Sequence, residues 1–258
     1  NEQVDLYVLQ QSAKASIRTV ALKRDNTFLV ADVRGDLMVP QQEMGLFWHD
    51  TRYLNALDLL LGGQPLMGLS HSVAENGDVC QIDLCNPYLQ LHGEDVPQGT
   101  IHVRRTVEIH EQELVQHITL ASYYPRPLRV TFGVRAAADF RDIFEIRGLV
   151  RNERGQMLAP VRQATALTFR YHGCDDRMRS AAIAVSPPAD AVTAQGLAWD
   201  LVLPPGQLTQ MQIVVTLHEG AAQADGPSPP DAPRQHGITP AMPEISANNV
   251  FFNRLLSR

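Results

Sequence analysis

Two ten-residue segments of this sequence combine acids, arginines and aromatic rings densely enough to suggest chemistry or binding. Residues 45–54 read GLFWHDTRYL, and residues 139–148 read DFRDIFEIRG. A solvated loop would not need so many aromatic side chains, and a plain core strand would not tolerate the charges. The simplest role is a partly buried network of ion pairs that holds loops at one end of the fold. With Arg105 added from a third segment, the candidate site residues are Asp50, Thr51, Arg52, Tyr53, Arg105, Asp139, Arg141, Asp142, Glu145 and Arg147.

The acids of the second segment suggest glycoside hydrolysis, which needs two carboxyl groups about 5–10 Å apart. Asp139, Asp142 and Glu145 are close enough in sequence to meet that distance. However, Arg141 and Arg147 lie among them and should hold the acids ionised, whereas a general acid must keep its proton. We therefore expect no catalytic residue in this chain.

Histidine and cysteine chemistry is not indicated either. The nine histidines are scattered, and no pair has the spacing of metal ligands. Cys80, Cys85 and Cys174 are too few, and odd in number, for a disulfide framework. Reduced, largely buried thiols are typical of a cytoplasmic protein, and we expect that location. No metal and no cofactor is expected.

Arg105 lies in an alternating run, 101–109, on the same side as its apolar residues. Alternation therefore points Arg105 into the core, unless a β-bulge turns it outward. A buried guanidinium needs an acid partner, because an isolated buried charge is too costly. The candidate partners are Asp50, Asp139, Asp142 and Glu145, and Arg52 is expected to form an ion pair with one of the same four acids.

The elements that must position these residues are strands, because apolar residues recur with a period of two. Clear examples are 101–110, 128–134 and 211–217. Turn signals separate such runs about every 8–15 residues, which is typical of a large antiparallel β-sandwich. Predicted turns include Asp25-Asn26, Gly62-Gly63, Glu111-Gln112 and the hairpin break Pro204-Pro205-Gly206. The predicted fold class is all-β.

Composition limits the partners and the organisation. The chain has 258 residues and a formal charge of -6, which argues against binding to nucleic acid. No window approaches ~18 consecutive apolar residues, which argues against a membrane span. We expect one sandwich domain over 1–219 and a Pro-rich linker over 220–243. Residues 244–258 are expected to begin a helix that leads into a further domain.

Four segments together resemble one known family. GLFWHDTRYL, LLLGGQPL, IHVRRTVEI and DFRDIFEIRG are similar to the amino-terminal domain of bacterial and archaeal glycogen debranching enzymes of the amylo-α-1,6-glucosidase type. The resemblance covers roughly residues 25–150 well and the remainder weakly. It implies a β-supersandwich that precedes an (α/α)6 barrel with the catalytic carboxylates, and this barrel is absent from the sequence.

The resemblance implies a non-catalytic domain that packs on its downstream (α/α)6 domain and helps to shape an α-glucan cleft. Trp48, Tyr53, Phe140 and Phe144 are expected to belong to the core, although they could instead stack on glucose rings. Two alternatives remain open. One is an autonomous carbohydrate-binding module, and the other is a mutarotase-like enzyme, which would need a His–Glu pair in a concave pocket.

Overall fold

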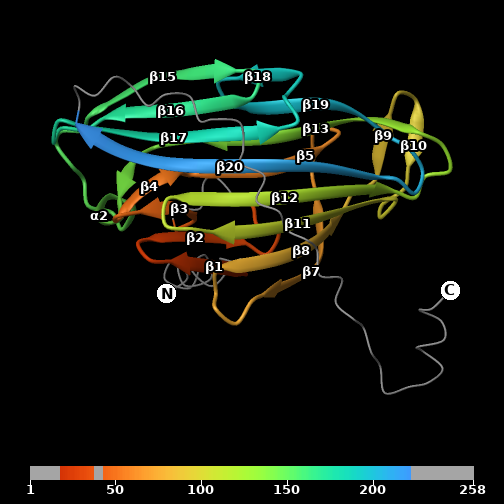
Figure 1. Cartoon of the computed structure of the whole chain (residues 1–258), viewed down its shortest axis with the longest axis horizontal. Coiled ribbons are helices and arrows are strands. Elements are labelled where there is room, and N and C mark those ends of the chain that lie inside the picture. Colours follow the sequence, from red (N-terminus) through yellow and green to blue (C-terminus); the bar gives the residue numbers. More distant parts are fainter. Residues whose placement is uncertain (1–17, 38–42, 222–258) are drawn as a thin grey trace, which may run out of the picture.

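The computed structural model describes residues 18–37 and 43–221. The predicted linker, apart from its first two residues, and the predicted C-terminal helix lie outside the described residues. Within them the regular secondary structure is nearly all β-strand, which confirms the all-β class (Figure 1). No helix in this part of the chain is long and apolar enough to span a membrane.

The largest layer is an eight-stranded antiparallel sheet, whose two edges are β15 and β7. Its strands in spatial order are β15 (Gln156–Gln163), β16 (Ala166–His172), β17 (Arg177–Ser186), β20 (Leu208–Ala221), β12 (Glu113–Ser122), β11 (Ile101–Ile109), β8 (Val79–Cys85) and β7 (Met67–Val73).

Two five-stranded sheets and a small ribbon complete the structure. One sheet contains β18 (Ala191–Thr193), β19 (Gly196–Leu203), β13 (Leu128–Ala137), β5 (Ala56–Leu61) and β6 (Gln64–Pro65). The other contains β1 (Thr19–Arg24), β2 (Thr27–Asp32), β3 (Gly45–Trp48), β4 (Thr51–Leu54) and β14 (Arg141–Asp142). The ribbon pairs β9 (Leu89–Leu91) with β10 (Glu94–Val96), and the short helix α2 spans Ile143–Ile146.

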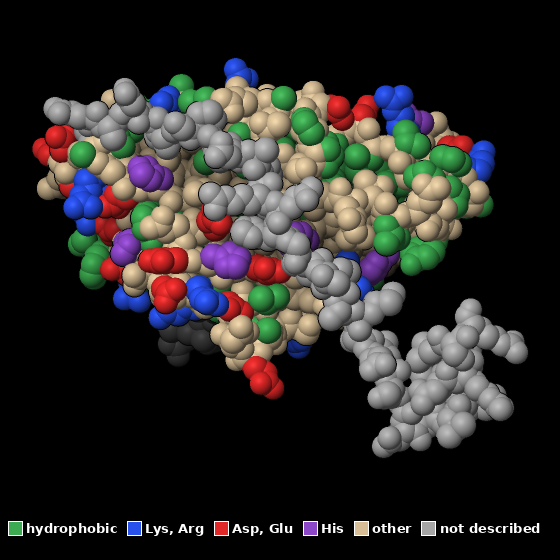
Figure 2. Space-filling model, in the orientation of Figure 1, with side chains coloured by type: hydrophobic (Ala, Val, Ile, Leu, Met, Phe, Trp, Pro, Cys, Tyr) green, Lys and Arg blue, Asp and Glu red, His purple; other side chains and the backbone are tan. Residues whose placement is uncertain are grey.

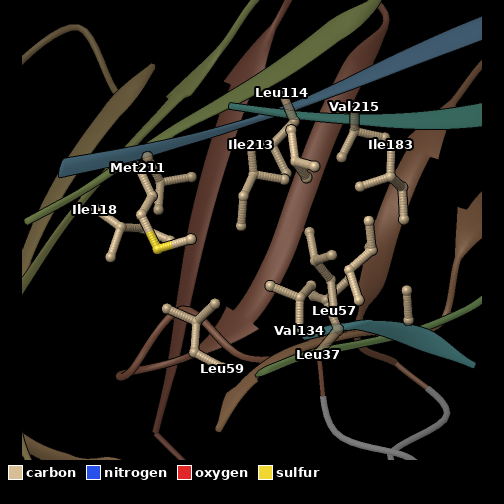
Figure 3. Packing of buried hydrophobic residues seen from close by; sticks show 14 of the residues in the cluster. Leu37, Leu57, Leu59, Leu114, Ile118, Val134, Ile183, Met211, Ile213 and Val215 are labelled. Carbon is tan, nitrogen blue, oxygen red and sulfur yellow. The ribbon is translucent and has the colours of Figure 1, made fainter. Parts of the chain in front are cut away.

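The core lies between the eight-stranded sheet and the sheet that contains β5 and β13. Figure 3 shows Leu114, Ile213 and Val215 of the first sheet pointing toward Leu57 and Val134 of the second. All five side chains are buried. Burial of each such side chain stabilises the fold by about 1.5–3 kcal/mol. This gain explains why the apolar residues of each alternating run lie on the strand face that points into the core.

The turn predictions were mostly correct. Asp25-Asn26 joins β1 to β2, and Gly62-Gly63 joins β5 to β6 with φ values of 57° and 75°, which glycine adopts most easily. The Pro204-Pro205-Gly206 break does end β19, but the predicted hairpin is wrong because β20 belongs to the other sheet. Gly206 donates its amide hydrogen to the carbonyl of Ser122, which directs the chain onto β12 instead.

Candidate functional site

The two charged segments meet at one end of the sandwich, called here the α2 end. The short strand β14 pairs with β4, so that Arg141 lies opposite Arg52 and Asp142 opposite Thr51. The amide of Ile143 also donates to the carbonyl of Asp50 at 2.9 Å. Tertiary structure therefore brings together segments that are about ninety residues apart in sequence (Figure 1).

Arg52 is the buried centre of this arrangement. Its guanidinium contacts both carboxylate oxygens of Asp139, with distances of 3.1 Å from Nε and 2.5 Å from Nη2, and Nη1 donates to the carbonyl of Met44 at 3.1 Å. A Cβ added to Gly45 would lie 2.4 Å from Cδ of Arg52, so glycine is required there. The predicted ion pair of Arg52 with one of the four candidate acids is confirmed.

The other two acids of the second segment organise α2. Asp142 caps the helix by accepting from the amides of Phe144 and Glu145 at 2.9 Å, and Glu145 accepts in return from the amide of Asp142 at 3.1 Å. Arg151 forms an ion pair with Asp142, and Arg154 forms one with Glu145 at 3.0 Å. The segments therefore form the predicted network of ion pairs, with two arginines that the sequence analysis did not single out.

The remaining candidates at this end are more peripheral. Arg141 lies 3.7 Å from Asp139 and is largely exposed, and Arg147 is the exposed C-cap of α2. Asp50 is exposed in a turn with a φ of 61°, and Thr51 is half-buried. The Tyr53 side chain is buried, and its hydroxyl has no hydrogen-bond partner among the described residues. Burial raises the pKa of Tyr53 well above its ordinary value.

Arg105 is fully buried, as alternation predicted, but the four predicted partners are wrong. Its Nη1 lies 2.7 Å from Oδ1 of Asp36, and its Nε donates to Gln116 at 3.1 Å. Asp36 also accepts from the amide of Leu59 at 3.2 Å, so this ion pair connects β11 to β5 across the core. The turn after β2 places Asp36 between the sheets. Alternation along β11 predicts that Arg105 is buried, but it does not indicate which acid from another segment lies opposite it.

Burial raises the pKa of Asp36, and the charge and hydrogen bond of Arg105 oppose that rise. Arg105 therefore serves an internal network, separate from the contacts described at the α2 end.

A hollow of about 270 Å³ opens beside the α2 network. Arg179 lies on its wall, contacts Asp175 at 2.6 Å and contacts Glu219 at 3.1 Å. The hydrogen bond from Arg179 lowers the pKa of Asp175 to about 2. The sequence analysis missed Asp175, Arg179 and Glu219, because they lie on β20 and around β17, far from either charged segment.

Aromatic rings form a continuous packing chain behind this hollow. Tyr53 and Phe140 pack edge to face with centroids 5.3 Å apart, and Phe140 stacks on Tyr171 at 5.5 Å. The expectation that Trp48, Tyr53 and Phe140 belong to the core is confirmed. It is wrong for Phe144, which is 59% exposed, because α2 turns its ring outward from the end of the sandwich.

Phe144 belongs to an exposed apolar strip, defined here as Phe144, Leu149 and Val150, in which Val150 is 87% exposed. The last described strand, β20, ends at the same end of the molecule (Figure 1). Glu219 near its end contacts Arg177 at 2.5 Å as well as Arg179. β20 therefore ends close to the hollow, through the contact of Glu219 with Arg179.

No group of three or more His, Cys, Asp or Glu side chains within 18–37 and 43–221 is arranged to hold a metal ion.

Comparison with known proteins identifies one family. The family described as the N-terminal domain of some glycogen debranching enzymes matches residues 22–214. Among solved structures, a putative kojibiose phosphorylase from the human microbiome is similar with a TM-score of 0.54 and 8% identity, and the match covers 80% of this chain and 30% of that one. No curated protein sequence matches.

Two further structures are similar at lower scores. A putative aldose 1-epimerase from Escherichia coli K12 has a TM-score of 0.43 and 10% identity, covering 78% of this chain and 98% of that one. A 4-alpha-glucanotransferase from Thermococcus litoralis has a TM-score of 0.38 and 9% identity, covering 79% and 38%. Because the phosphorylase is only 8% identical to this chain, its similarity shows a shared fold and nothing more.

Proposed function

This chain belongs to the family of N-terminal domains of some glycogen debranching enzymes, and from that premise we propose that it is a non-catalytic module of a debranching-type glycoside hydrolase. In this proposal its α2 end packs on a downstream (α/α)6 catalytic domain and forms one wall of an α-glucan cleft.

The observation that carries the proposal is where β20 ends. β20 ends at Ala221, two residues after Glu219, which contacts Arg177 and Arg179, and at the same end of the molecule as α2 (Figure 1). A domain tethered by a linker has a raised effective concentration near the residue at which the linker begins. A downstream domain could therefore dock at the α2 end without the linker having to cross the length of the sandwich.

The composition of the α2 end also suits a contact between domains. Phe144, Leu149 and Val150 form an apolar centre, and the ion pairs of Asp142 and Glu145 form a charged border. Interfaces between proteins have this anatomy, with an apolar centre and a polar rim. The capping box fixes the orientation of α2, so less ordering is needed when a partner binds.

The acids of this end support a structural role more than a catalytic one. Asp139, Asp142 and Glu145 each have an arginine partner, and Asp142 and Glu145 also close the helix cap. A cationic partner favours the charged form of a carboxyl group, whereas a general acid must keep its proton. The hollow beside them, with both donors and acceptors on its walls, suits the hydroxyl groups of a sugar chain.

The test compares amide hydrogen exchange in the full-length protein that the gene encodes with exchange in the 258-residue chain. Amides of 143–151 should exchange at least about tenfold more slowly in the full-length protein, because docking removes local opening. Val150→Asp should abolish that protection, whereas Val202→Asp, at another exposed valine, should not. Equal exchange in both proteins, or a gene product without a further domain, would overturn the proposal.

An autonomous carbohydrate-binding module is the second candidate, and the exposed side chains of Tyr88 and Tyr123, at the end of the sandwich opposite α2, favour it. A mutarotase-like enzyme has less support. His110 and Glu108 are 3.9 Å apart, but they lie near the end of one strand and do not line the hollow at the α2 end.

A further inference from the structure

We infer that the end of the sandwich opposite α2 is a separate sugar-binding surface, at which rings of a glucan chain stack on Tyr88 and Tyr123. This surface, called here the β9–β10 end, lies at the other extreme of the molecule's long axis (Figure 1). The inference rests on the proposed function only for the class of ligand, an α-glucan. The surface itself follows from the side chains.

Two exposed tyrosines mark the β9–β10 end. Tyr88 is 60% exposed and Tyr123 is 69% exposed. The amide of Tyr123 donates to the carbonyl of Thr100 at 2.9 Å. The following residue, Ile101, donates its amide to the side chain of Asn86 at 2.7 Å, and Asn86 lies two residues before Tyr88. The segment Thr100-Ile101 therefore connects the backbone near Tyr88 to that of Tyr123.

The apolar surface extends beyond the tyrosines. Leu208, also largely exposed, pairs with Ala121 two residues before Tyr123. Figure 2 shows hydrophobic side chains gathered at this end, on the right of the view, with charged side chains along its rim. Exposed apolar groups that cluster in this way mark binding sites more often than isolated ones do.

Hydrogen bonds hold the rings of Tyr88 and of Tyr124, the neighbour of Tyr123, in place. The hydroxyl of Tyr88 bonds to Asp95 of β10, and the hydroxyl of Tyr124 donates to Glu94 at 2.8 Å. Arg126 donates to the same Glu94 oxygen at 2.9 Å. Rings fixed before binding lose little conformational entropy when a ligand stacks on them, and tyrosine offers a large amphipathic face for that purpose.

A hollow of about 600 Å³ adjoins the same ribbon. Leu91, which ends β9, and Glu94, which begins β10, both line it, together with Arg126 and Arg129. This volume is within the range of about 300–1,000 Å³ found for small-molecule sites.

The charges of this end favour an uncharged ligand. Arg126 pairs with Glu94, Arg129 pairs with Asp200, and Asp95 bonds to the Tyr88 hydroxyl, so a charged ligand would compete with contacts that these groups already make. The remaining lone pairs and N–H groups suit hydroxyl groups, which both donate and accept. The negative faces of tyrosine rings suit the C–H groups on one side of a sugar ring. A neutral polyhydroxylated ring satisfies all of these features.

Because the two ends are far apart, binding at the β9–β10 end leaves the α2 end free for a second domain. Such a surface would hold an outer branch of a large glucan while another branch enters a cleft elsewhere.

The test is calorimetric titration of the 258-residue chain with maltoheptaose. Replacing both tyrosines, Tyr88→Ala with Tyr123→Ala, should weaken binding by about tenfold or more, because the stacking faces are lost. Val73→Ala is the control, since it removes an exposed apolar side chain of β7 that belongs to neither end of the sandwich, and it should leave the affinity unchanged. Tyr88→Phe, which keeps the ring and loses only the hydroxyl, should retain most of the affinity.

Thermal unfolding of each variant checks that it folds. No binding by the unaltered chain, or full affinity in the folded double variant, would overturn the inference. Loss of affinity in Phe144→Ala alone would also overturn it and would place the sugar at the α2 end. None of these results bears on docking, which amide exchange in the full-length protein tests separately.

Discussion

Arg52 and Arg105 are both buried guanidinium groups, but they stabilise different parts of the molecule. Arg52 holds Asp139 and the carbonyl of Met44 at the α2 end, whereas Arg105 holds Asp36 between two sheets. In each case the arginine neutralises a carboxylate that has little contact with water. The two residues therefore allow a direct test of what a buried ion pair contributes here.

We expect Arg105→Ala to lower the free energy of unfolding by about 3–5 kcal/mol, because the buried Asp36 carboxyl would lose its nearest cationic partner. Arg52→Ala should be near the lower end of that range, since Asp139 is less buried. Arg129→Ala is the control, because this side chain is 63% exposed and its pair should contribute under about 1 kcal/mol. Urea unfolding measures all three, and equal losses for Arg105→Ala and Arg129→Ala would contradict the expectation.

Tyr53 tests whether a conspicuous residue of the charged segment depends on its hydroxyl. Its hydroxyl is buried without a partner among the described residues, so Tyr53→Phe should raise the free energy of unfolding by about 0.5–1 kcal/mol. Tyr171→Phe should lower it by about 1 kcal/mol, because that hydroxyl accepts from the amide of Gly155 at 2.8 Å. A loss of stability in Tyr53→Phe would indicate a hydrogen bond that the structure does not contain.

Asp175 should contribute to stability in a way that depends on pH. The hydrogen bond from Arg179 lowers the folded-state pKa of Asp175 from 3.8 to about 2. Because the folded-state pKa is depressed, the stabilisation is present above about pH 4 and is lost as the pH falls through about 2. Since the side chain is 47% exposed, the contribution should be under about 1 kcal/mol.

The measurement for Asp175 is the difference in thermal midpoint between the unaltered chain and Asp175→Asn as the pH is lowered. The difference should shrink toward zero near pH 2. A difference that stays constant over the whole range would contradict the assigned ion pair.

At the scale of elements, α2 shows how a very short helix keeps a defined position. Four residues cannot form a stable helix alone. The conformational entropy lost when the first turn forms exceeds the stabilisation from the hydrogen bond of that turn. The capping box of Asp142 and Glu145, together with the pairing of β14 to β4, supplies the missing stabilisation. The exposed strip that follows depends on this anchoring.

Asp142→Ala should therefore loosen α2 without unfolding the sandwich. Removing the cap should cost about 1 kcal/mol locally and speed amide exchange in 143–151, while exchange in β12 stays unchanged. Asp142→Asn is the control, since asparagine is as good a cap as aspartate but cannot pair with Arg151. Equally fast exchange in both variants would show that the ion pair, not the cap, holds the helix.

At the scale of the whole molecule, the expectation concerns activity. We expect the 258-residue chain to release no glucose or linear chains from a branched dextrin, because its clustered acids are paired with arginines. Asp142→Asn and Glu145→Gln serve as controls for any activity found. Turnover that disappears in either control would move these carboxylates from the scaffold into an active site.

The sequence by itself determined the all-β class, most of the turns, the burial of Arg105 and the ion pair of Arg52 with one of the nearby acids. These features follow from alternation and from turn chemistry, which act over a few residues. The resemblance of the two charged segments pointed to the family that matches 22–214.

Only the tertiary structure decided which acid pairs with Arg105, which sheet receives β20, and which of the four aromatic rings stays exposed. It also assembled the hollow at the α2 end from β4, α2 and β17, and the tyrosines at the β9–β10 end. These outcomes depend on how sheets stack and where chain crossings pass. A pattern along one strand reports which face is buried, but not what lies across the core from it.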